Sequence, residues 1–140
     1  MAIRLGMEAV LNYKTGGQDG AGSWVELANV RDVTLSLEAG EADVTTRANS
    51  GWRAVVATLK EASVEFEMVW DTADAGFTAI KDAFFNNEVI GLQVLDGDAG
   101  SGLEADFSIT NFSRSEQLEE ALTVSVTAKV TYDGTAPSWT

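Results

Sequence analysis

The chain has 140 residues, of which 45% are hydrophobic and 22% are charged, enough for one domain with a buried core. It contains no histidine and no cysteine, which excludes a Ser-His-Asp relay, a cysteine nucleophile, disulfides and a Cys/His zinc site. Its formal charge of -13 would repel phosphate backbones and anionic membranes, which disfavours stable nucleic-acid binding and membrane association.

Most of the chain alternates apolar and polar side chains, which is typical of strands with one buried and one wet face. For example, the apolar face carries Val33, Leu35 and Leu37, or Val64, Phe66, Met68 and Trp70, and the run at 122–132 alternates most cleanly. A polar stretch at about 39–52 has no clear period and is predicted to be a long loop. Strands are expected at 3–13, 23–29, 32–38, 64–71, 89–96, 103–110 and 122–133, and 52–59 fits either strand or turn.

The segment 74–87 breaks this alternation. Its apolar residues Phe77, Ile80 and Phe84 are spaced as on one face of a helix, and Asp74 is one of the residues that could cap its start. We therefore expect one amphipathic helix over the sheets. The whole chain, 1–140, is predicted to be a single mainly β domain, a β-sandwich or partial barrel of roughly seven or eight strands, with a short tail at about 134–140.

The most distinctive stretch places two arginines and a tryptophan in an acidic chain: Asp43, Arg47, Trp52 and Arg53. One interpretation is a surface loop held by an Asp43–Arg47 ion pair, which would contribute little to stability. The other is a docking arm whose cations meet an acidic surface on a neighbouring copy. Trp24 also adjoins a loop, so it is either at the edge of the core or in an interface.

No group of residues has the spacing of a catalytic or metal site. Glu65 and Glu67 lie two apart on one strand face, which does not place two carboxylates across a sugar cleft. The carboxylates around the glycine-rich turn at 96–102 lack the EF-hand spacing. We expect no enzymatic activity, no metal and no cofactor. No signal peptide or membrane span is evident, so synthesis in the cytoplasm is the default.

The order of these segments resembles the tail tube proteins, or major tail proteins, of long-tailed bacteriophages, over roughly residues 3–133. The resemblance depends on Trp24 to Leu35, on Asp-Val-Thr-Thr-Arg at 43–47 followed by Gly-Trp-Arg, on Val64 to Asp71 with the helix after it, and on Asp106 to Arg114.

The resemblance implies a structural subunit of the virion tail, without cofactor, that is assembled in the host cytoplasm. Copies would form rings, typically hexameric, that stack into a tube through which DNA passes without specific binding. The partners implied are further copies, the tape measure, initiator and terminator proteins, and no membrane. The loop at about 39–52 would contact the next ring, with Asp43, Arg47, Trp52, Arg53 and Trp24 as contact candidates. Four wet-face carboxylates are candidates for lining the lumen: Glu65, Glu67, Glu104 and Asp106.

Two alternatives stay open at this stage. One is a soluble β-sandwich binding module, for example for carbohydrate, that uses an exposed tryptophan. The other is the tube subunit of a related contractile injection or secretion system, because the sequence does not separate contractile from non-contractile assemblies.

Overall fold

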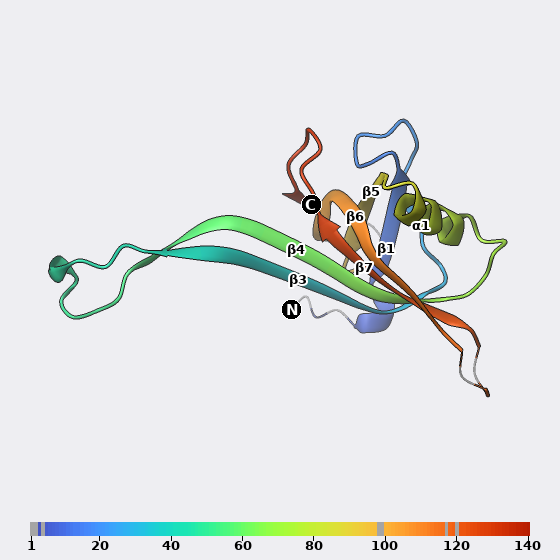
Figure 1. Ribbon diagram of the computed structural model, residues 1–140, viewed down its shortest axis with the longest axis horizontal. Helices are drawn as coiled ribbons and strands as arrows, with labels where there is room; N and C mark the ends of the chain where they lie inside the picture. Colours follow the sequence, from blue (N-terminus) through green and yellow to red (C-terminus); the bar gives the residue numbers. More distant parts are fainter. Residues whose placement is uncertain (1–2, 4, 98–99, 117, 120) are drawn as a thin grey trace.

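The computed structural model describes residues 3, 5–97, 100–116, 118–119 and 121–140. Eight antiparallel strands and one α-helix make up most of the described chain (Figure 1). The strands are β1 (Val10–Thr15), β2 (Val25–Glu26), β3 (Val30–Asp43), β4 (Val55–Val69), β5 (Val89–Leu95), β6 (Gly102–Ser115), β7 (Thr123–Val130) and β8 (Ser138–Trp139). The helices are α1 (Ala75–Phe85) and two 3-10 turns, η1 (Gly6–Glu8) and η2 (Arg47–Asn49).

The strands form one curled sheet in the order β2-β1-β5-β6-β7-β4-β3, and β8 adds to β6. Strand β6 is the corner of this sheet, because its first half pairs with β5 and its second half with β7. Only Phe107 and Ser108 pair with both β5 and β7. The corner divides the sheet into a β2-β1-β5-β6 part and a β6-β7-β4-β3 part, which together make the predicted partial barrel with one flanking helix.

The core fills the concave side of the sheet beneath α1. Phe77 and Ile80 of α1 are buried against residues of β4, β5, β6 and β7 such as Met68 and Phe107. The side chain of Asp74 accepts a hydrogen bond from the backbone N–H of Phe77 at 2.9 Å and so caps the helix, and Asn86 ends it. The predicted helix is confirmed. No helix in the described part of the chain has both the length and the apolar character to cross a bilayer.

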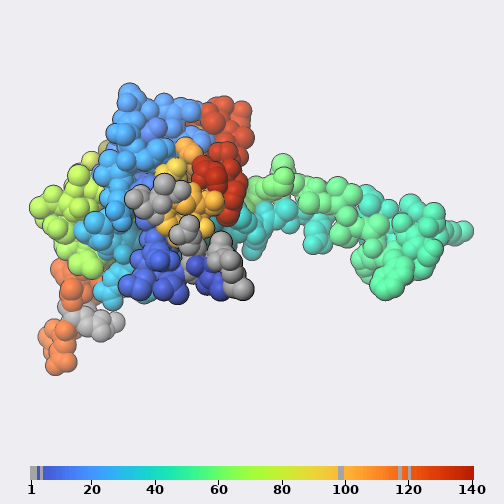
Figure 2. All heavy atoms as spheres, turned by 180° about the vertical axis from the view of Figure 1, so that it is seen from behind, coloured from blue at the N-terminus to red at the C-terminus, as the bar shows by residue number. Residues whose placement is uncertain are grey.

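Strands β3 and β4 continue far beyond the rest of the sheet as a two-stranded arm (Figures 1 and 2). β7 pairs with β4 only at Ser63–Val69, so the stretch Val55–Ala62 pairs with β3 alone. At about 3.3 Å per residue, this unsupported stretch extends about 26 Å from the body. We call the segment 37–62 the arm, and the segment 43–53 its tip.

Several predicted boundaries and faces were wrong. The strand predicted at 3–13 starts at Val10 because η1 precedes it, and 23–29 contains only the short β2. The loop predicted at about 39–52 is shorter, since β3 continues to Asp43. Val33 and Leu37 are 37% and 55% exposed rather than buried. An irregularity in the β3–β4 register at 31–34 displaces Val33, and Leu37 already lies on the arm.

Candidate assembly surfaces

Hydrogen bonds within the tip hold it in a defined shape. Thr45 bridges its two sides, because its hydroxyl donates a hydrogen bond to the backbone carbonyl of Ala54 at 3.2 Å and accepts one from the Ala54 N–H at 2.8 Å. The side chain of Asn49 accepts from the Thr46 N–H at 2.6 Å across the η2 turn. Ser50 and Gly51 then turn the chain back with positive φ angles of 55° and 83°. Local hydrogen bonds therefore give the tip a defined conformation.

The tip presents charge to solvent. Arg53 Nη1 lies 3.8 Å from Asp43 Oδ2, and both side chains are largely exposed. The ion pair of Asp43 is thus with Arg53, not with Arg47 as the simpler interpretation of the sequence expected. The Thr45 side chain, together with the Thr45 backbone N–H that donates to Asp43 Oδ1 at 2.9 Å, holds the pKa of Asp43 below its usual value. With two arginines and one aspartate, the tip carries one net positive charge in a chain of formal charge -13.

The arm also exposes apolar side chains. Trp52 is 79% and Leu59 85% exposed, and Val44, Val55 and Val56 are each about half exposed. Apolar side chains gathered on one projecting element are typical of a protein–protein interface. The structure brings four of the predicted contact residues together on the tip: Asp43, Arg47, Trp52 and Arg53. Trp24 is not part of this group, because it lies beside β2 with Lys14 Nζ 5.0 Å from its ring centroid.

The face of the β6-β7-β4-β3 part that lies opposite the core is polar. Glu65 pairs in register with Thr34 of β3 and Thr127 of β7, and such partners lie side by side on one face. Glu67 is next along β4, between Arg31 and Ser125. Lys129, opposite Ser63, is on the same face. We call this surface the polar face. Its hydroxyls surround two carboxylates, Glu65 and Glu67, and two cations, Arg31 and Lys129.

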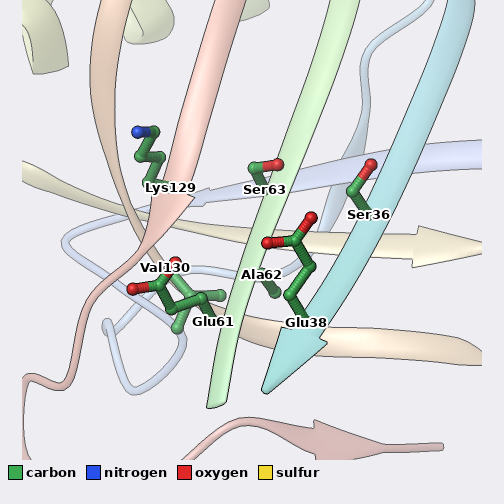
Figure 3. Close-up of a pocket in the computed structure, with 7 residues that line it drawn as sticks. All are labelled: Ser36, Glu38, Glu61, Ala62, Ser63, Lys129 and Val130. Carbon is green, nitrogen blue, oxygen red and sulfur yellow. The ribbon is translucent and has the colours of Figure 1, made fainter. Parts of the chain in front are cut away.

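A hollow of about 310 Å³ marks the place where the arm leaves the body (Figure 3). Glu38 of β3 and Glu61 of β4 are register partners at its rim, and Lys129 and Ser63 lie on its body side. Two like charges opposite each other destabilise a strand pair unless a cation compensates them. Lys129 is the one cation that lines the hollow, so the hollow carries one net negative charge.

Glu104 and Asp106 do not belong to this surface. Glu104 is on the first half of β6, where its neighbours are Gln93 of β5 and Ser138 of β8. Asp106 is only 2% exposed, so the prediction that it lines a lumen was wrong. Its carboxylate accepts hydrogen bonds from the backbone N–H of Gln18 at 2.6 Å and from the Gln18 side-chain amide at 3.4 Å. Alternation places it on a wet face, but the loop after β1 covers that half of β6.

The role of Gln18 was missed by the sequence analysis. Its side-chain amide also donates to the carbonyl of Thr135 at 3.1 Å, so it joins the loop at 16–22, β6 and the C-terminal segment. Gly17 (φ +93°) permits this approach, because a Cβ there would come within 2.7 Å of Asp106 Oδ1. The paired glycines at 16–17 were the available signal, but a glycine pair does not reveal what approaches the backbone.

One family model, described as phage tail tube protein, matches residues 5–133. The tail of an empty gene transfer agent (GTA) particle, refined with C6 symmetry, has a TM-score of 0.80 at 23% identity over 99% of both chains. The native GTA virion has a TM-score of 0.76 at 21% identity, again over 99% of both chains. The SPP1 tail tube gives 0.73 at 18% identity, covering 91% of this chain and 76% of that chain. None of the curated proteins compared with the sequence matches it.

Proposed function

Because this chain belongs to the phage tail tube protein family, we propose that six copies close into a ring and that the rings stack into a conduit for DNA. A tail tube protein is a structural subunit of the virion tail and not an enzyme. The number six is supported by the C6 symmetry of the GTA tail, whose chain shares this fold. The free edges and faces of this chain support a definite way for such a ring to close.

Ring closure requires two complementary strand edges on each copy. The outer edge of β3 has no strand partner among the described residues, and the same holds for the side of Asn111–Ser115 that faces away from β7. These are the two edges of the β6-β7-β4-β3 part. Because β3 runs antiparallel to the second half of β6, rotation about a ring axis would bring the two edges together as an antiparallel pair.

Such a ring has one face of the four-stranded part inside and the other outside. The concave face is filled by the core and α1, so the polar face is the one available to the lumen. Glu65 and Glu67 would then line the lumen, with Ser125, Thr127 and Thr34 between and beside them. The carboxylates repel the phosphate backbone. The two cations of this face lie apart, Arg31 beside Glu67 and Lys129 beside Ser63, and so form no basic stripe that would hold DNA, so DNA would slide.

The remaining partners are proposals that come from the family. A tube of defined length needs a tape measure protein inside it and initiator and terminator proteins at its ends. Assembly would take place in the host cytoplasm, without a membrane.

The observation that carries this proposal is the pair of uncovered edges on either side of one polar-faced sheet. Electron microscopy of purified protein over a range of concentration and salt tests it, since a charge of -13 per copy opposes association until it is screened. We expect hollow tubes or six-fold rings. Dispersed monomers at every concentration and salt, even after seeding with assembled tail tips, would contradict it.

A further inference from the structure

The strand directions place two hairpin ends at opposite poles of the molecule. β3 leads out to the arm tip, and β7, which runs parallel to β3, starts at the turn that joins it to β6. The arm tip and the β6–β7 turn therefore point in opposite directions along one sheet, and Figures 1 and 2 both show them at opposite ends. When copies repeat head to tail, the tip of one copy faces the turn of the next.

The β6–β7 turn exposes carboxylates around an apolar side chain, whereas the tip exposes arginines beside one. Leu118 is 100% exposed there, and Glu116 and Glu119 lie on either side of it in the sequence. The last strand pair before the turn is Ser115 with Thr123. A fully exposed leucine between carboxylates contributes nothing to the fold of the isolated subunit. The tip offers the complement, an exposed Trp52 beside Arg47 and Arg53.

The ion pairs that these groups make within one copy are weak enough to exchange. Glu116 Oε1 lies 3.0 Å from Arg114 Nη2, with both side chains about half exposed. The Asp43–Arg53 pair of the tip is longer, at 3.8 Å, and also exposed. Exposed pairs of this kind typically contribute about 0–1 kcal/mol. Arg114 also stacks its guanidinium 5.0 Å from the ring of Trp70, so it has a partner that remains if Glu116 turns away.

We propose that the arm tip of one subunit docks on the β6–β7 turn of a subunit in the next ring, with Trp52 against Leu118 and Arg47 and Arg53 against Glu116 and Glu119. The contact joins opposite poles, so it is heterologous and repeats without closing, as stacking requires. This inference rests on the proposed tube. It names the surface on the second copy that receives the arm.

Disulfide trapping tests the contact directly, because the chain has no cysteine of its own. Trp52→Cys protein and Leu118→Cys protein are mixed, assembled under reducing conditions, checked for tubes by electron microscopy and then oxidised. A disulfide needs Cα atoms within about 7 Å, so only a direct contact gives a covalent dimer. Phe85→Cys is the matched control for Leu118→Cys, because Phe85 is 69% exposed on α1, away from both poles.

We expect the Trp52→Cys and Leu118→Cys mixture to form covalent dimers in tubes, at least about tenfold more than the mixture of Trp52→Cys with Phe85→Cys. Tubes that give equal or no cross-linking, or that cross-link Trp52→Cys to Glu61→Cys in the hollow instead, would overturn the docking inference alone. Failure of the unmodified chain to form tubes even from tail-tip seeds would overturn the proposed tube function, and the docking with it.

Charge reversal gives a second readout that does not depend on the two apolar residues. The double variants Arg47→Glu/Arg53→Glu and Glu116→Arg/Glu119→Arg should each raise the concentration needed for tubes about tenfold. Combining all four changes in one chain should restore assembly, whereas Lys81→Glu on α1 should leave it unchanged. Equal assembly by all these variants would overturn the inference.

Discussion

The two halves of β4 have the same strand geometry and opposite surroundings. In the body, where β7 pairs with β4, Val64 and Met68 are fully buried in the core, whereas Leu59, on the arm, is 85% exposed. The body buries most of the apolar residues of its strands and helix within one chain. The arm has only β3 beside it, so its apolar residues have no place to be buried except against another molecule. The difference separates residues that make the fold from residues that make the assembly.

The largest expected effect is on the body. Phe107→Ala would leave a cavity in the centre of the core, where Phe107 is fully buried, and should lower the free energy of unfolding by about 3–5 kcal/mol. Urea denaturation measures it. Leu59→Ala is the matched variant on the arm and should change the unfolding free energy by less than about 0.5 kcal/mol. A comparable loss from both variants would remove the distinction between body and arm.

The next effect concerns the buried carboxylate. Asp106→Ala leaves the backbone N–H of Gln18 buried without its acceptor, so it should lower the free energy of unfolding by about 1–3 kcal/mol. It should also loosen the C-terminal segment, which Gln18 holds through Thr135. Denaturation gives the first value, and limited proteolysis near the C-terminus gives the second. Glu104→Ala, two residues away on the same strand face, serves as the control and should be close to neutral.

A third change should affect the passage of DNA through the tube but not the stability of the fold. Glu65→Lys/Glu67→Lys should leave the unfolding free energy within about 0.5 kcal/mol, because both side chains lie on the polar face. In assembled particles it should reduce DNA delivery by roughly tenfold, since cations in the lumen would hold phosphates. Glu104→Lys, outside the polar face, is the control. Unchanged delivery by the double variant would mean that the polar face does not line the lumen.

The smallest effect is at the arm tip and depends on pH. Thr45 lowers the pKa of Asp43. The ionised carboxylate therefore stabilises the folded tip fully at pH values above the unfolded pKa of about 3.9. This stabilisation is lost as the pH falls through the lower folded value. Amide exchange at Thr45 should therefore accelerate only below about pH 4. Asp43→Asn should flatten this dependence, and acceleration that begins near neutral pH would contradict the assignment.

The sequence predicted those strands and the helix whose hydrophobic periodicity arises because one side of the element is buried. The alternation at 103–110 and at 122–133 and the spacing of Phe77, Ile80 and Phe84 each reflect one side facing a core, and the structure has β6, β7 and α1 there. Most of the arm was not predicted as strand. The segment 39–43 was assigned to a loop and 52–59 fitted either strand or turn, because Ala39–Asp43 and Val55–Ala62 face no core and so carry no clear period of two. Leu37 looks buried in the sequence for a related reason, since local alternation does not say where the body ends. Val33 looks buried because alternation does not reveal the register irregularity at 31–34.

The candidate sites divide in the same way. Asp43, Arg47, Trp52 and Arg53 were identified from their rarity in an acidic chain, and the structure brings them together on the tip. Asp106 was misassigned because alternation gives the face of a strand but not what covers that face. Gln18, which covers it, comes from 88 residues earlier in the chain, and local sequence carries no signal for such a contact.

A reconstruction of tubes assembled from the unmodified chain, at a resolution that separates strands, is the sharpest test of how the ring closes. We expect β3 of each copy to lie antiparallel beside the second half of β6 in the next copy. We also expect Glu65 and Glu67 to face the channel. A ring in which β3 has no neighbouring strand, or in which the polar face points outward, would contradict the proposed closure.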